Sequence, residues 1–218
     1  MTTQIEDVVR YAGEDWTLYE KTSCVFDFDA LGIKVGYAST ACWRGFQLFY
    51  ELRGTTLLLG EIWAHAIPIP KKVLGVSPER LSKAAGLNAV FRPLNQALNY
   101  SGGIILTRDL LDYPVMRSEI YEFGRVTELL FDGGNLVDII DRTQAVADVR
   151  CAMHQREKDA NELGKNWLDV GPDALADATR ETFFWPYYEP RYTRYLELRE
   201  WARTYEVSDQ ADTDRDHE

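Results

Sequence analysis

The sequence has little cysteine, and its cysteines are poorly placed for a disulfide framework or a zinc site. Its 218 residues include Cys24, Cys42 and Cys151, an odd number with no Cys-x-x-Cys spacing. A structural zinc site needs about four Cys or His ligands, and no close pair among the three cysteines and three histidines begins one. We therefore expect no metal and no disulfide, and the cysteine usage indicates a reducing cytoplasm.

Targeting and membrane-spanning segments are also missing. The first ten residues, MTTQIEDVVR, lack both the basic start and the apolar run of a secretory signal. No stretch approaches 18 consecutive apolar residues. We expect a cytoplasmic protein that has no membrane partner.

Common catalytic and nucleotide-binding motifs are absent too. The sequence contains no HExxH, GxSxG, GxGxxG or GxxxxGK[ST] string. The stretches SGG at 101–103 and DGG at 132–134 are interpreted as turns, because neither opens a predicted helix. We expect no cofactor, and we favour a non-catalytic role over an enzymatic one.

Positive charge is scarce. The chain has 24 Lys and Arg against 35 Asp and Glu, and its net charge of −11 argues against nucleic acid as a partner, because phosphate binding needs a basic surface. The last thirteen residues hold six acids and one Arg, which leaves a charge of −6 on residues 1–205. We expect residues 206–218 to form a disordered acidic tail.

The sequence is rich in aromatic and apolar residues, which form strand-like runs over the first two-thirds of the chain. Two long runs, 46–52 and 55–66, flank Arg53-Gly54, and two more flank Asp132-Gly133-Gly134; both patterns are typical of hairpins. Further strands are predicted over 24–32, 33–39 and 103–107, within a strand-like region that begins at Trp16.

Helix signals are concentrated in the last third. Residues 143–164 have helical composition, with Thr143 as a candidate N-cap and Gly164 as a candidate C-cap. Shorter helices are predicted over 172–181 and 190–205. An earlier helix is predicted over 77–86, followed by loop and short helix over 87–102.

Strands followed by helices predict an α+β fold. We expect an antiparallel β-sheet built from hairpins over about 16–140, followed by a C-terminal helical layer over about 143–205. Residues 1–205 then form one compact domain.

The passage STACWRGFQLFYELRGTTLLLGEIWAHA, residues 39–66, raises the main question about chemistry. A two-residue turn would place Cys42 opposite His65 and Arg44 opposite Trp63. A three-residue turn would place Trp43 opposite Trp63 instead, and the sequence leaves both registers open.

Each pairing in this passage has a structural and a functional interpretation. Cys42 with His65 could form a catalytic pair, but a small buried Cys42 is favoured. Arg44 over Trp63 would be a cation–π contact that, together with Trp43, fastens the hairpin. Arg44 could instead hold a carboxylate or a phosphate.

A second candidate region is the aromatic block at 183–188. It is interpreted as packing of helices onto the sheet or as a partner surface, because Trp, Tyr and Arg are typical of binding hot spots. Across both regions, the candidate partner- or ligand-binding residues are Arg44, Trp63, His65, Trp185, Tyr187, Tyr188 and Arg191.

The leading functional hypothesis is a non-catalytic cytoplasmic binding protein. An acidic inhibitor or bacterial immunity-type protein that binds a basic protein partner would fit the charge. One alternative is an enzyme or small-ligand sensor that uses the sheet face around Arg44, Trp63 and His65. A second alternative is a subunit of a larger assembly that uses the aromatic block, and homo-oligomer formation stays open.

Overall fold

A computed structural model describes residues 4–84, 86–111 and 120–164. The chain divides into two units, residues 1–146 and residues 147–218, which are described separately. The predicted helices over 172–181 and 190–205, the aromatic block and the acidic tail lie outside the described residues. The expected single domain over 1–205 therefore stays a prediction.

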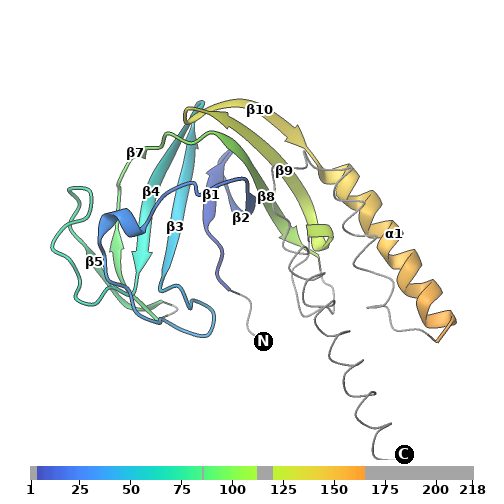
Figure 1. Cartoon of the computed structure of the whole chain (residues 1–218), viewed down its shortest axis with the longest axis horizontal. Helices are drawn as coiled ribbons and strands as arrows, with labels where there is room; N and C mark the ends of the chain where they lie inside the picture. Colours follow the sequence, from blue (N-terminus) through green and yellow to red (C-terminus); the bar gives the residue numbers. More distant parts are fainter. Residues whose placement is uncertain (1–3, 85, 112–119, 165–218) are drawn as a thin grey trace, which may run out of the picture. The chain divides into compact units, whose positions relative to one another are not determined.

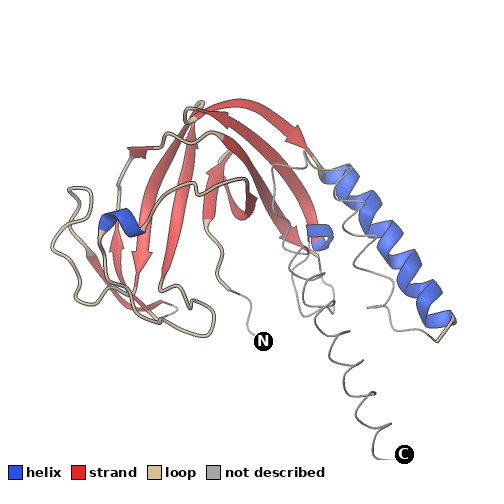
Figure 2. Cartoon of the chain, viewed as in Figure 1, coloured by secondary structure: helices blue, strands red, loops and turns tan. Residues whose placement is uncertain are grey.

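Strands predominate in the described chain, as Figure 2 shows. The elements are β1 (Val8–Tyr11), β2 (Glu14–Lys21), the 3-10 turn η1 (Asp29–Leu31), β3 (Phe46–Arg53), β4 (Thr56–Ala64), β5 (Glu79–Ala84), β6 (Leu87–Phe91), β7 (Gln96–Ala97), β8 (Gly102–Leu110), the 3-10 turn η2 (Ile120–Glu122), β9 (Phe123–Asp132), β10 (Asn135–Asp141) and the helix α1 (Thr143–Glu162).

The ten strands form one mixed sheet in the order β10-β9-β8-β2-β1-β3-β4-β6-β5, with β7 paired to β4 (Figure 1). The expected purely antiparallel sheet is wrong at one place, because β1 and β3 run parallel, with Val8 beside Phe49 and Arg10 beside Glu51. Parallel neighbours need a long connection, and the chain supplies one: β2 and the loop over 22–45 separate β1 from β3. The remaining pairings are antiparallel.

The two predicted hairpins are confirmed. Strands β3 and β4 turn at Gly54-Thr55, and β9 and β10 turn at Gly133-Gly134. Gly134 has a φ of 80°, and a Cβ there would lie 1.8 Å from the carbonyl oxygen of Leu98, so both backbone conformation and space require glycine.

The sheet of the first unit curls until β10 meets β4. Asn135 pairs with Thr56, and the Leu57 amide donates a hydrogen bond of 2.9 Å to the Gly134 carbonyl. The inner face holds one apolar core to which most of the strands contribute, with members including Val9, Leu18, Leu48, Leu59, Ile62, Phe91, Ile104, Leu106 and Leu129.

The strands predicted over 24–32 and 33–39 are wrong. Asp27 Oδ1 accepts hydrogen bonds from the Asp29 and Ala30 amides at 3.1 and 3.3 Å, and this local bonding holds the chain in the turn η1. Short polar side chains compete for backbone groups in this way, so an alternating pattern did not produce a strand. In the second segment, Val35 forms an isolated bridge with Ala66.

The helix predicted over 77–86 is also wrong, because residues 79–84 form β5. Glu79 and Arg80 pair with Val90 and Ala89 of β6, a strand that the sequence interpretation assigned to loop and short helix. Pairing to a neighbouring strand has overridden weak local helix signals.

The long helix is confirmed as α1, and its C-terminal glycine is confirmed too. Gly164 has a φ of 65°, and its amide donates to the Asn161 carbonyl at 3.1 Å. At the N-terminus, Asp141 Oδ1 accepts the Thr143 amide hydrogen at 2.8 Å, so Asp141 takes the capping role expected of Thr143. Hydrogen bonds from Thr143 also lower the pKa of Asp141 below its usual value.

Among the described residues, no helix is both long and apolar enough to cross a membrane.

Candidate protein-binding surface

An ion pair with a buried carboxylate joins the segment before β1 to the loop before β3. Asp7 is 3% exposed, and its Oδ1 contacts Nη2 of Arg44. The same oxygen accepts the Leu48 amide hydrogen at 2.8 Å. Because an unpaired buried carboxylate is costly, this pair fixes Arg44 firmly in place.

The other contacts of Arg44 point to the same structural role. Its Nε donates to the Phe46 carbonyl at 2.7 Å, and its guanidinium lies 4.9 Å from the centre of the Phe46 ring. Phe46 in turn stacks on Phe28 at 3.9 Å. These contacts agree with the structural interpretation of Arg44, but its ring partner is Phe46, and the expected contact with Trp63 is wrong.

The loop over 39–45 is held along its length by the segment before β1. Gln4 donates from Nε2 to the Thr40 carbonyl and accepts the Trp43 amide hydrogen at Oε1, both at 2.9 Å. The Ile5 amide donates to the Ala41 carbonyl at 2.7 Å. Trp43 therefore sits on a fixed backbone, yet its side chain is 61% exposed, which contradicts the expectation that Trp43 fastens the hairpin.

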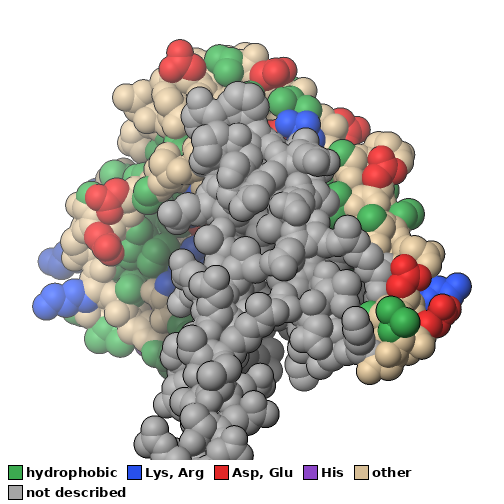
Figure 3. Space-filling view, turned by 45° about the vertical axis from the view of Figure 1, so that its right-hand side comes forward, with side chains coloured by type: hydrophobic (Ala, Val, Ile, Leu, Met, Phe, Trp, Pro, Cys, Tyr) green, Lys and Arg blue, Asp and Glu red, His purple; other side chains and the backbone are tan. Residues whose placement is uncertain are grey.

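Two further exposed apolar side chains, Tyr37 and Ile67, lie on neighbouring segments. The segment of Tyr37 is hydrogen-bonded to this loop, and the segment of Ile67 is hydrogen-bonded to the segment of Tyr37. Tyr37 is 60% exposed and Ile67 is 55% exposed. The Ala38 amide donates to the Cys42 carbonyl at 3.3 Å, and the Ile67 amide donates to the Lys34 carbonyl at 2.9 Å. We call Tyr37, Trp43 and Ile67 the loop surface. In Figure 3, hydrophobic side chains lie beside charged ones within the described parts of the chain.

Cys42 and His65 do not form the proposed pair. Both predicted registers are wrong, because Arg53 faces Thr56 and a bulge at Phe49/Tyr50 shifts the rest, so that Phe46 faces Ala64. Cys42 is 1% exposed, as favoured, and lies 3.6 Å from the Phe46 carbonyl oxygen. His65 is half-buried, and its Nδ1 lies 2.8 Å from the Gly86 carbonyl oxygen.

Trp63 lies on the face of β4 opposite the apolar core. Its ring packs against Phe49 at 5.1 Å, and its Nε1 donates to Glu61 Oε2 at 2.8 Å. Arg44, Trp63 and His65 therefore have separate sets of contacts. Trp185, Tyr187, Tyr188 and Arg191 lie outside the described residues.

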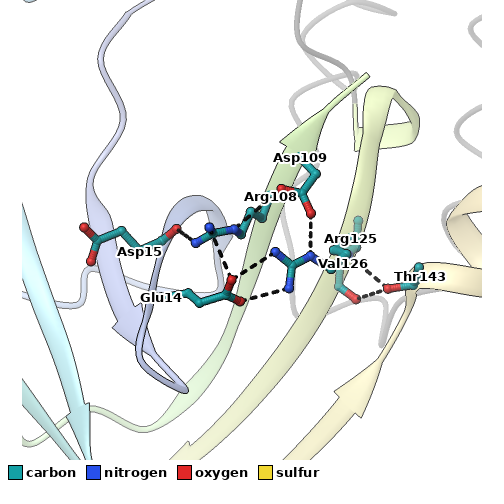
Figure 4. A network of polar contacts seen from close by, with 7 residues as sticks. All are labelled: Glu14, Asp15, Arg108, Asp109, Arg125, Val126 and Thr143. Carbon is teal, nitrogen blue, oxygen red and sulfur yellow. Dashed lines mark hydrogen bonds and ion pairs between the residues drawn. The ribbon is translucent and has the colours of Figure 1, made fainter. Parts of the chain in front are cut away.

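A second set of charges, the ion network of Glu14, Arg108, Asp109 and Arg125, links β2, β8 and β9 (Figure 4). Arg125 Nη1 lies 2.9 Å from Glu14 Oε2, and its Nε lies 2.5 Å from Asp109 Oδ2. The hydrogen bonds from Arg125 lower the pKa of both Glu14 and Asp109. Because each charge faces an opposite one and the set joins three strands, we interpret it as structural.

A further buried carboxylate is paired in the same sheet. Glu128 on β9 is fully buried, and Arg142 donates to its Oε2 from Nε at 2.8 Å and from Nη2 at 2.7 Å. Across the described ranges, no group of three or more Cys, His, Asp or Glu is arranged to hold a metal ion.

Sequence reasoning missed Gln4, Asp7 and Tyr37. Nothing local marks Gln4 or Asp7, since their partners lie 36–41 residues away. Tyr37 lies in the stretch IKVGYAS, which was interpreted as a strand, so nothing local marked its side chain as exposed.

Comparison of the chain with models of protein families, with curated proteins and with solved structures finds no match. The functional conclusion therefore rests on the geometry of this chain.

Proposed function

We propose that this chain is a non-catalytic binding protein that recognises a basic protein partner through the loop surface, as an inhibitor or immunity-type protein would. The observation that carries the proposal is Trp43, whose side chain is 61% exposed on a backbone held by Gln4, Ile5 and the Asp7–Arg44 pair. Trp and Tyr are enriched among binding hot spots. A preformed loop also lowers the entropy lost on association.

The charge of the chain supports a basic partner. A net charge of −11 raises the rate at which a positively charged protein encounters the chain as a whole. The loop surface itself lies within residues 30–108, which hold nine Lys and Arg against three Glu, so its own contacts are expected to be apolar and aromatic. The thiols of Cys24 and Cys151 are exposed and unpaired, which favours a reducing cytoplasm as the place of action.

The experiment starts from a partner isolated from the native host and then purified. Calorimetry would measure its affinity for the full chain and for Trp43→Ala and Tyr37→Ala. We expect each variant to weaken binding at least tenfold, and the wild-type affinity to fall between about 50 and 300 mM salt. Leu110→Ala is the matched control, because Leu110 is 60% exposed on β8, outside the loop surface.

An equal loss of affinity for Leu110→Ala and Trp43→Ala would contradict the proposal, as would an affinity that does not depend on salt. Melting curves of all variants should match the wild type, so that weaker binding is not caused by unfolding.

The enzyme or sensor alternative has less support. It needs Arg44, Trp63 and His65 to converge on one ligand. In the structure, Arg44 pairs with Asp7. Trp63 bonds to Glu61, and His65 bonds to the Gly86 carbonyl. The assembly alternative rests on the aromatic block, and a mass measurement on the purified complex tests it.

A further inference from the structure

Strand β10 forms one margin of the sheet (Figure 1). It pairs with β9 from Asn135 to Asp141. On its other side, it meets β4 at Asn135 and Thr56, and the Leu136 amide donates to the Thr55 carbonyl at 2.6 Å. Beyond Leu136, no strand of the described chain pairs with this side of β10.

The side chains of β10 are unusually apolar for an edge strand. Val137 is 62% exposed and Ile139 is 46% exposed. Proteins commonly protect edge strands with Lys, Pro or a bulge. Strand β10 has a bulge between Leu136 and Asp138 but contains neither Lys nor Pro.

The opposite margin of the same sheet is built differently. Strand β5 has the sequence ERLSKA and follows Pro78, so it has the Lys and the flanking proline that discourage pairing with another chain, whereas the charges of β10 are both acidic. The contrast between the two margins indicates that β10 is the one suited to accept a strand.

Charge along β10 indicates what kind of strand would pair there. Residues 126–141 contain four acids and no Lys or Arg, and Asp132, Asp138 and Asp141 are exposed. By contrast, residues 30–108 contain nine Lys and Arg, three Glu and no Asp. Strands β9 and β10 therefore present three exposed acids, Asp132, Asp138 and Asp141, at this edge, whereas residues 30–108 carry a net positive charge.

We propose that an extended segment of the partner, with Lys or Arg alternating with Val or Ile, adds as an additional strand to the side of β10 that no described strand pairs with beyond Leu136. Main-chain hydrogen bonds would supply affinity, and the alternating side chains would supply specificity. The inference rests on the proposed function and names how the partner binds.

A basic partner is favoured over a second copy of this chain. Two β10 strands paired with each other would bring Asp138 and Asp141 of both copies into one short ladder, and like charges facing each other across strands are destabilising. A Lys- or Arg-bearing strand would place opposite charges there.

The test uses the full chain and synthetic peptides as probes. Binding of the capped peptide KVKIKVK is followed through the backbone amide signals of residues 135–141 by NMR. We expect it to bind at least tenfold more tightly than EVEIEVE, and we expect KVKPKVK to lose most of the affinity, because proline cannot donate to the ladder.

Two variants locate the site. Asp138→Lys should weaken KVKIKVK binding at least fivefold, and Val137→Lys should weaken it similarly by giving the edge a protective charge. Asp29→Lys is the matched control, because it reverses an exposed acid in η1 and should leave binding unchanged. Melting curves confirm that each variant is folded.

Several outcomes would overturn the inference. These are equal binding of KVKIKVK and EVEIEVE, equal effects of Asp29→Lys and Asp138→Lys, amide shifts confined to other strands, or a wild-type dimer that Val137→Lys dissolves.

The isolated partner separates the two proposals. If Trp43→Ala abolishes partner binding while Asp138→Lys and Val137→Lys leave it unchanged, the proposed function stands and the strand-addition inference fails. If KVKIKVK binds at β10 but the loop variants keep full partner affinity, the proposed role of the loop surface is wrong and the proposed strand addition at β10 is supported.

Discussion

The Asp7–Arg44 pair and the ion network around Arg125 both join carboxylates to guanidinium groups, but in two different surroundings. In the first, the Asp7 carboxylate is almost completely buried although Arg44 is 33% exposed, whereas in the second the side chains of both signs are 31–52% exposed. A buried charge that loses its partner cannot turn to water, but an exposed one can. The smaller, buried pair should therefore matter far more to stability than the larger, exposed network.

The largest effect is expected from Arg44→Ala. It leaves the Asp7 carboxylate buried without its cation and removes the hydrogen bond to the Phe46 carbonyl. We expect the free energy of unfolding to fall by about 3–5 kcal/mol, measured by urea denaturation.

A second readout of Arg44→Ala follows the Cys42 thiol. In the wild type, Cys42 should resist alkylation while the exposed Cys24 reacts. The variant should label Cys42 faster and Cys24 at the same rate. Rapid wild-type labelling of Cys42 would contradict the structural role of this passage.

A somewhat smaller effect is expected from Asp7→Ala. It leaves the Leu48 amide without its acceptor, but Arg44 is one-third exposed and can be hydrated. We expect a loss of about 2–3 kcal/mol. The double variant with Arg44→Ala should cost at least about 1 kcal/mol less than the sum of the single changes, because the two residues form one unit. Additive losses would show that they act independently.

The contribution of the exposed network to stability should depend mainly on pH. Arg125 holds the pKa of Glu14 below its unfolded value of 4.5. The stabilisation of the folded state by this pair is therefore fully present above that pH and is lost as the pH falls through the folded pKa of Glu14. Glu14→Gln should lower the melting temperature at pH 7 by no more than about 2 °C. It should also flatten the decline in stability between about pH 5 and pH 2. A decline as steep as that of the wild type would contradict this assignment.

The smallest effect is expected from Arg10→Ala. Its partner Asp15 lies 2.9 Å away, but both side chains are more than half exposed. The melting temperature at 0.15 M salt should stay within about 1 °C of the wild type. A larger drop would mean that exposure alone does not separate the strong ion pairs from the weak ones.

Local chemistry made part of this fold predictable. The turns at Gly54 and Gly133 depend on a few adjacent residues, and the composition of the helix that ends at Glu162, just before Gly164, is visible directly in the sequence. The strands predicted around Asp27 failed because one side chain captured two backbone amides, which an alternating pattern does not reveal.

The site was less predictable, because its geometry depends on distant partners. Arg44 was assigned a structural role, but Asp7 lies 37 residues earlier, and only the parallel pairing of β1 and β3 brings the two together. The exposure of Trp43 was not predicted, because aromatic residues in a strand-rich passage are usually buried.

The position of β1 has a consequence for how the molecule folds. Its four residues separate β2 from β3, so the half of the sheet that ends in β10 and the half that ends in β5 are joined along this short strand and where β10 meets β4 at Asn135 and Thr56. Its pairing with β3 closes a connection of more than thirty residues, and such non-local contacts slow folding. The amide hydrogens of Val9 and Arg10 should thus exchange with solvent only when the whole sheet opens, and they would report the cooperative unfolding of both halves.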